Sequence, residues 1–198
     1  MASPKLSDLI RSDLDRFRQT YQLRGQSYSP RRVFWESVLF KSGFQALLLH
    51  RIGHRLSERG WVYLPWFLAR VSLALTGAEI EFNAIIGPGM LIAHSSGIVI
   101  GRGTVIGSGV TVFQGVTLGV KSWQPGSIGQ FPVVGDGCHL FAGAAILGGV
   151  RIGADCVVGA HAVVTTDMPD GALAVGVPAK IYPAKGRETL ASWAASDH

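Results

Sequence analysis

The stretch IEFNAIIGPGMLIAHSSGIVIGRGTVIGSGVTVFQGVTLG, from Ile80 to Gly119, decides the fold because aliphatic residues return in it in steps of six. A period of six fits neither the 3.6-residue turn of a helix nor the two-residue alternation of a strand. The chain must therefore turn a corner every six residues, and three short strands complete one triangular coil of a solenoid. The in-phase positions are Ile80, Ile86, Ile92, Ile100, Ile106, Val112, Leu118, Val134, Leu140, Ile146, Ile152, Val158 and Val164.

Two interruptions break this period, and an interruption in a solenoid must leave the stack as a bulge or loop. The first is the segment from His94 to Gly97, and the second is an arm from Val120 to Phe131. Functional residues often lie in such loops. Cys138 and Cys156 are 18 residues apart, one full coil, so we expect their side chains to stack in the core as inert thiols.

Ahead of the repeat, the apolar spacing is helical. It predicts three helices, with a loop between the first and the second: Lys5–Thr20, Val33–Glu58 and Val62–Leu75, with the loop at Gln22–Arg32. We therefore divide the chain into a helical region (1–77), a repeat domain (78–182) and a C-terminal tail (183–198), which we expect to form a short helix.

The composition bounds the function. The chain has 198 residues, of which 47% are hydrophobic and 16% charged, so it folds rather than staying disordered. Its charge of +5 suits a phosphorylated cofactor better than nucleic acid, because no basic run is interleaved with aromatic residues. The apolar segment Trp61–Leu75 is interrupted by Pro65 and Arg70, and the N-terminus carries charges where an export signal would be apolar. We expect a cytoplasmic protein without an integral membrane segment.

Four motifs within this frame resemble the hexapeptide-repeat acyltransferases and, among them, the serine acetyltransferases. They are GFQALLLHRIGHRL at Gly43–Leu56, HSSGIVIG at His94–Gly101, VTLG at Val116–Gly119 and GVPAK at Gly176–Lys180. The resemblance implies a mainly β fold, a left-handed parallel β-helix preceded by an α-helical segment. It also implies acyl transfer from acetyl-CoA to a hydroxyl, and a homotrimer, with a dimer of trimers as the alternative.

The resemblance implies a catalytic pair. His94 aligns with the family's catalytic histidine, and Glu79 stands where the family has the aspartate that orients it. A hydroxyl is a poor nucleophile unless a base takes its proton, and histidine suits that task near neutral pH. A carboxylate beside it would fix the imidazole tautomer and stabilise the imidazolium. A surface histidine at a bend is the simpler interpretation of an arbitrary His, but the motif around His94 favours catalysis.

The resemblance also implies a groove for coenzyme A. Backbone groups and small residues at the coil corners are expected to line the pantetheine arm, and lysines are expected to meet the phosphates. Corner packing alone is the structural interpretation of the same small residues. The expected cofactor-binding residues are Gly119, Val120, Lys121, Ala142, Ala160 and Lys180.

The acceptor site departs from the family pattern. In the family, two aspartates, an arginine and a second histidine hold an amino acid, and charged pairs of this kind discriminate strongly. The corresponding positions here, which we expect to line the substrate pocket, are Tyr21, Ala93, Gln130 and Phe131. We therefore expect an acceptor other than free serine, such as a sugar, an exopolysaccharide or a specialised metabolite. The alternative is an L-serine O-acetyltransferase of cysteine biosynthesis.

Two other functions share this fold. A γ-class carbonic anhydrase needs three histidines around zinc, but His50 and His54 lie in the helical region and His139 and His161 stand singly, so we expect no metal. A non-catalytic scaffold is the second. Serine acetyltransferases can dock a partner enzyme through a C-terminal isoleucine, which the terminal His198 does not support.

Overall fold

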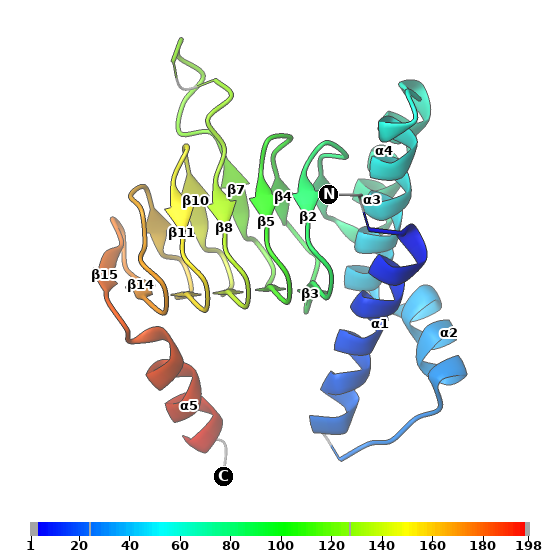
Figure 1. The fold of residues 1–198 in the computed structure, drawn as a ribbon, viewed down its shortest axis with the longest axis horizontal. Coiled ribbons are helices and arrows are strands. Elements are labelled where there is room, and N and C mark those ends of the chain that lie inside the picture. Colours follow the sequence, from blue (N-terminus) through cyan, green and yellow to red (C-terminus); the bar gives the residue numbers. More distant parts are fainter. Residues whose placement is uncertain (1–3, 24, 127, 197–198) are drawn as a thin grey trace.

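The computed structural model describes residues 4–23, 25–126 and 128–196, and Figure 1 shows a strand solenoid flanked by helices. The helices are α1 (Leu6–Leu23), α2 (Pro30–Phe40), α3 (Ser42–Glu58), α4 (Tyr63–Thr76) and α5 (Gly186–Ser196). The strands are β1 (Glu79–Ile80), β2 (Ile85–Ile86), β3 (Leu91–Ile92), β4 (Val99–Ile100), β5 (Val105–Ile106), β6 (Thr111–Val112), β7 (Thr117–Gly119), β8 (Val133–Val134), β9 (His139–Leu140), β10 (Ala145–Leu147), β11 (Arg151–Ile152), β12 (Val157–Val158), β13 (Val163–Val164), β14 (Leu173–Val175) and β15 (Lys180–Tyr182).

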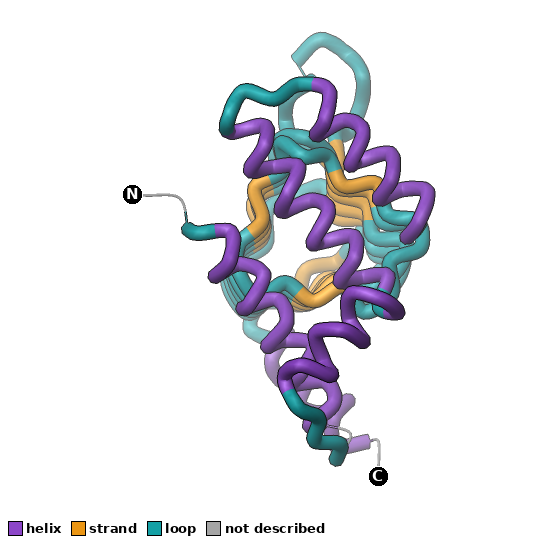
Figure 2. Tube along the Cα trace, turned by 90° about the vertical axis from the view of Figure 1, so that its right-hand side faces the viewer, coloured by secondary structure: helices purple, strands orange, loops and turns teal. Residues whose placement is uncertain are grey.

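The strands form the three sides of a β-helix. Sheet A has the order β1-β4-β7-β10-β13, sheet B the order β11-β8-β5-β2, and sheet C the order β15-β14-β12-β9-β6-β3. Successive coils pair in parallel, for example Ile80 with Ile100 and Ile100 with Leu118. Seen from the helical end in Figure 2, the strands gather in three groups around the axis.

The core of the β-helix consists of the residues that the six-residue period places inward. All the in-phase aliphatic residues are buried, none with more than the 6% exposure of Ile86. Cys138 and Cys156 are free thiols with 0% exposure on adjacent coils, where the backbone N–H of His139 donates to the carbonyl of Cys156. The thiols donate to the carbonyls of Gly153 and Pro169. The predicted stacking of the two cysteines is confirmed.

Helix α3 covers the open end of the first coil. Its Phe44 and Leu47 are buried in the same core as the strand residues. Gly43 lies so close to β3 that an added Cβ would stand 2.9 Å from the Cβ of Ile92. Only glycine lets the helix approach this closely.

A buried ion pair ties α1 to α3. Arg51 Nε lies 3.1 Å from Asp13 Oδ2, and both side chains are almost fully buried. The guanidinium also donates to the carbonyls of Ile86 and Gly87, and Asp13 accepts from the backbone N–H of Met90. The two helices and the first coil are therefore joined by one polar cluster.

The helical region differs from the prediction in one place. Instead of one helix over Val33–Glu58, the chain breaks at Lys41, whose φ of −102° and ψ of 97° are extended. The break lets α3 direct Gly43 and Phe44 toward the first coil. At the predicted loop, α1 runs on to Leu23 and α2 begins at Pro30.

The far end of the β-helix is closed by a reversal of direction. Strand β15 pairs antiparallel with β14, through Leu173 and Tyr182 among others, and α5 follows it within the predicted tail. Among the described residues, no helix is both long and apolar enough to cross a membrane.

Candidate active site

His94 lies in the first interruption of the repeat, between β3 and β4, and its side chain is exposed. The next residue fixes the loop, because Ser95 is buried and its Oγ donates to the carbonyl of Thr76 at the end of α4 (2.6 Å). The backbone N–H of Gly97, at a φ of +70°, donates to the carbonyl of Gly77. The loop is therefore held against α4, while the imidazole stays free to meet a ligand.

An open hollow of about 440 Å³ lies beside His94. It is formed by the start of α3, the end of α4 and the His94 loop: Ser42, Leu75, Thr76, Gly77, His94, Ser95 and Ser96. Of these residues, His94 is the one histidine, the residue type that most often serves as a general base. The hollow thus offers a base and several hydroxyls, but no cation or carboxylate of its own.

Glu79 is not among the residues that line the His94 hollow. It begins β1, pairs in register with Val99 and is half-buried. Its side chain lines a small hollow beneath α4 with Trp66 and Arg70. Among the described residues no hydrogen bond or ion pair joins Glu79 to His94, so in the single chain the expected pair is not formed.

The expected coenzyme A residues divide between two corners of the triangle. Ala142 and Ala160 lie on the corner where sheet C passes into sheet A, which is also the corner of His94. The turns of this corner stack through backbone hydrogen bonds, such as His161 N to Ala142 O at 2.8 Å. Ala142 is half-buried and Ala160 exposed, so a ligand can reach the backbone between small side chains.

The other expected coenzyme A residues lie elsewhere. Gly119 ends β7 at the corner where sheet A passes into sheet B, and Val120 and Lys121 begin the arm there. Lys180 is exposed at the start of β15, paired with Val175. A single chain therefore presents the expected groups at separate places on its surface.

Two of the expected acceptor residues belong to the base of the arm, which projects from the solenoid in Figure 1. Phe131 packs on the same corner of the preceding coil, so closely that a Cβ added to Gly101 or Gly103 would clash with its ring carbons. Gln130 lies exposed beside Gly149 on the following corner. The aromatic ring thus anchors the arm to the β-helix.

The other two expected acceptor residues lie outside the arm. Ala93 is half-buried directly before His94. Tyr21 is 7% exposed near the end of α1, with its ring edge-on to Tyr28 at 5.2 Å. The ammonium of Lys41 lies 5.4 Å from the centre of the Tyr21 ring.

Sequence reasoning missed Lys41. The residue directly precedes Ser42 of the His94 hollow, and it was expected inside a continuous helix. No local signal marks the break, because Lys41 is neither glycine nor proline.

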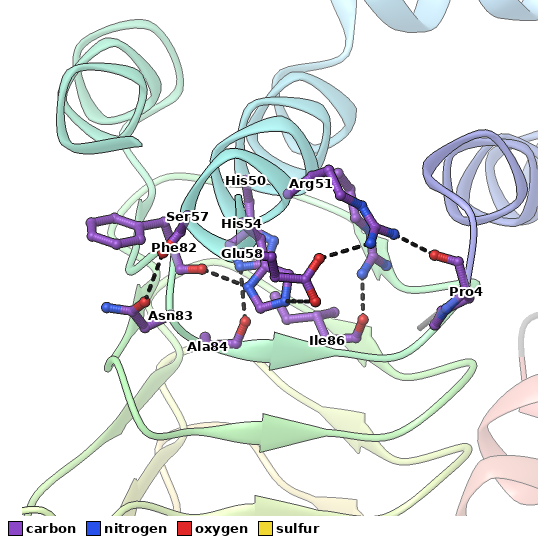
Figure 3. A network of polar contacts seen from close by, with 11 residues as sticks. Pro4, His50, Arg51, His54, Ser57, Glu58, Phe82, Asn83, Ala84 and Ile86 are labelled. Carbon is purple, nitrogen blue, oxygen red and sulfur yellow. Dashed lines mark hydrogen bonds and ion pairs between the residues drawn. The ribbon is translucent and has the colours of Figure 1, made fainter. Parts of the chain in front are cut away.

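The histidines of α3 have structural partners (Figure 3). Their rings stack at 5.8 Å, and His50 Nε2 and His54 Nδ1 bond to the carbonyls of Ala84 and Phe82. Burial lowers the pKa of His50 to about 3, and the charge of Arg51 adds to this effect. In the part of the chain that the structure describes, no group of three His, Cys, Asp or Glu side chains has a metal-binding arrangement.

A larger open hollow lies away from His94. It measures about 770 Å³ and follows the turn from α3 to α4, along residues 59–64 and Phe67. Its lining is mostly apolar and contains no group suited to accept a proton near neutral pH. The His94 hollow is the better candidate for catalysis.

Comparison with known proteins supports the predicted resemblance. Residues 131–166 match the family model described as bacterial transferase hexapeptide (six repeats). The serine acetyltransferase of Helicobacter pylori strain J99 is 39% identical over 163 residues, which are 78% of this chain and 94% of that protein.

Solved structures agree with this finding. Soybean serine acetyltransferase complexed with serine has a TM-score of 0.80 and 33% identity, covering 91% of this chain and 70% of that chain. A serine acetyltransferase in complex with CoA has a TM-score of 0.78 and 31% identity, covering 91% of this chain and 71% of that chain. The predicted left-handed β-helix with a helical N-terminal region is confirmed.

Proposed function

Because the chain belongs to the serine acetyltransferase family of acetyl-CoA-dependent O-acetyltransferases, we propose that it acetylates the hydroxyl of L-serine, with His94 as general base. The observation that carries the proposal is the 39% identity to a serine acetyltransferase over 94% of that protein's length. The anchored His94 loop and the hollow beside it are consistent with this chemistry.

The expectation of a sugar or specialised-metabolite acceptor is wrong. It rested on the missing charges at four aligned positions, whereas the related proteins are named serine acetyltransferases, and one of them is complexed with serine. Alignment compares residues position by position, so it overlooks a charge that another element supplies to the same hollow. Lys41 directly precedes Ser42 of this hollow and is a candidate for that charge.

In the proposed reaction His94 does the proton chemistry. Its imidazole takes the proton from the serine hydroxyl as the oxygen attacks the thioester carbonyl, so that an alkoxide need not form first. The tetrahedral adduct then collapses, the C–S bond breaks, and the imidazolium returns the proton to the departing thiolate. The orienting role of Glu79 stays a prediction.

The donor side of the site is proposed to involve a second copy of the chain. Gly119 and Lys121 lie at the corner where sheet A passes into sheet B, whereas Ala142 and Ala160 lie at the corner where sheet C passes into sheet A. Coenzyme A is proposed to contact both sets by lying in a groove between two copies. The homotrimer implied by the motifs provides such an interface. The cytoplasmic location and the three-part division of the chain also stay predictions.

The test is thiol release from acetyl-CoA in the presence of L-serine, with the acetylated product identified by mass. His94→Ala and His94→Asn should lower kcat by roughly 100- to 10,000-fold, the usual contribution of a general base. The Asn variant keeps hydrogen-bonding groups of similar size but cannot act as a base, and melting curves of both variants show whether the fold persists. Equal rates for wild type and His94→Asn would remove His94 as the base.

A further inference from the structure

We propose that Lys41 binds the carboxylate of the acceptor and so selects an amino acid over a neutral alcohol. The inference rests on the proposed function, because L-serine brings a carboxylate into the hollow beside His94. A carboxylate that leaves water needs a cation or several hydrogen-bond donors in exchange. The residues lining the hollow include no lysine or arginine.

Lys41 is placed at the hollow by the break between α2 and α3. Its Cα lies about 3.8 Å from that of Ser42, which lines the hollow, and a lysine side chain reaches well beyond this distance. The backbone of Lys41 is held on both sides, since its N–H donates to Ser37 O and its carbonyl accepts from Gln45 N. The Gln45 side chain also bridges the break by donating to Val38 O.

The side chain of Lys41 contacts an aromatic ring but has no carboxylate partner among the described residues. It is half-buried, and its ammonium lies over the ring of Tyr21 at a distance typical of a cation–π contact. Among the described residues, no carboxylate lies within ion-pair distance of this ammonium. A half-buried cation without an acidic partner gains the most from an anionic ligand.

Two other cations of the helical region already have partners. Arg51 is bound by Asp13 and by two carbonyls of the first coil. Arg16 donates to Thr111 Oγ1 and to the carbonyl of Gly109, on sheet C. Lys121 begins the arm, at the corner where sheet A passes into sheet B. Lys41, unlike these three residues, directly precedes a residue that lines the His94 hollow.

The experiment measures steady-state kinetics of the full chain with L-serine and acetyl-CoA. Lys41→Gln should raise the KM for L-serine by roughly 10- to 100-fold, the usual effect of losing one charged hydrogen bond. The kcat and the KM for acetyl-CoA should stay within about threefold of wild type, and Lys41→Arg should recover part of the loss. The matched control is Lys185→Gln, an exposed lysine of the C-terminal tail paired with Glu188, which should change nothing.

A second acceptor separates charge recognition from a general defect. With L-serinamide, which keeps the hydroxyl and the ammonium but has no carboxylate, Lys41→Gln and wild type should perform alike. Tyr21 acts as a positioning residue, so Tyr21→Leu should raise the KM for L-serine while Tyr21→Phe, which keeps the ring face, should not.

Three results would overturn the inference. An unchanged KM for L-serine in Lys41→Gln, with an unchanged melting temperature, removes Lys41 from the acceptor site. A rise in the KM for acetyl-CoA instead assigns the lysine to the donor. Absence of L-serine turnover by the wild type overturns the proposed function itself, and this inference with it.

Discussion

At the scale of single residues, two buried polar groups show why the helical region is fixed on the β-helix. Burial raises the pKa of Asp13, while the hydrogen bond and charge of Arg51 oppose this effect. His50, one residue before Arg51, is instead buried as a neutral imidazole. Its Nε2 forms a hydrogen bond with Ala84 O. The contact between α3 and the first coil therefore contains one buried ion pair and one buried neutral imidazole.

The neutral imidazole makes stability depend on pH. The pKa of His50 is about 3 in the folded chain, below the ordinary histidine value of about 6.5, so the unfolded chain binds the extra proton. Stability from this group is fully present above about pH 6.5 and declines as the pH falls toward 3. Between about pH 7.5 and pH 5, the free energy of unfolding should fall by roughly 2 kcal/mol more in wild type than in His50→Gln.

Urea denaturation of both proteins at the two pH values measures this difference. A glutamine amide can still donate to Ala84 O, so the variant retains the hydrogen bond that the ring makes. The difference between the two proteins cancels the contributions of other groups, including Asp13 and His54. Parallel losses of stability would show that His50 is not the group that titrates.

Some single residues could be predicted from the sequence, and others could not. His94 could be found because it interrupts a regular period within a recognisable motif, and the loop places it beside a hollow. Phe131 could be aligned, but its packing on Gly101 and Gly103 depends on contacts between coils that no local pattern encodes. Lys41 could not be found, because its place depends on a helix break that tertiary contacts impose.

At the scale of elements, the β-helix was predictable and the helix junctions were not. Every coil repeats one packing rule, so the inward positions followed from spacing alone. The contacts of helix α3 with the first coil are instead not repeated in any later coil, and the close approach of Gly43 to Ile92 is one of them. Leu39 and Phe40, at the end of α2, remain exposed, so the hydrophobic pattern ran through the break without marking it.

Two glycines of α3 allow a matched test of this contact. Alanine is the better helix former at both positions. At Gly43 the new Cβ would press on the Ile92 backbone, so Gly43→Ala should destabilise the protein by about 1–3 kcal/mol. At Gly53 the nearest atom is Phe82 Cβ at 3.6 Å, an ordinary contact, so Gly53→Ala should stabilise by about 0.5–1 kcal/mol.

Chemical denaturation of the two variants beside wild type measures these effects. If both substitutions stabilise the protein, the first coil can move away from α3 at little cost, and the close approach does not fix the helix.

At the scale of the whole molecule, the residues expected to bind coenzyme A lie on separate corners of the β-helix. In addition, large apolar side chains of the arm are exposed to solvent. Trp123 is 81% exposed and Ile128 59% exposed on the arm. Apolar side chains of this kind commonly become buried when oligomers assemble. Both observations favour assembly through the sides of the β-helix.

The proposed trimer predicts a mass of about 63 kDa in solution, three times that of the 21.1 kDa chain. Light scattering coupled to size-exclusion chromatography measures it directly. Trp123→Ser should shift the distribution toward smaller species if the arm contributes to the interface. A mass of one chain at all concentrations would contradict both the trimer and the shared donor site.

The closed ends of the solenoid decide how copies of the chain can meet. A parallel β-helix with bare ends would offer a ring of unpaired amide and carbonyl groups, on which further copies could stack into a filament. Here α3 lies across one end, and at the other β15 runs against its neighbours and is followed directly by Pro183, which has no N–H to donate. These features disfavour growth along the axis at α3 and at β15, so we expect discrete particles rather than fibres.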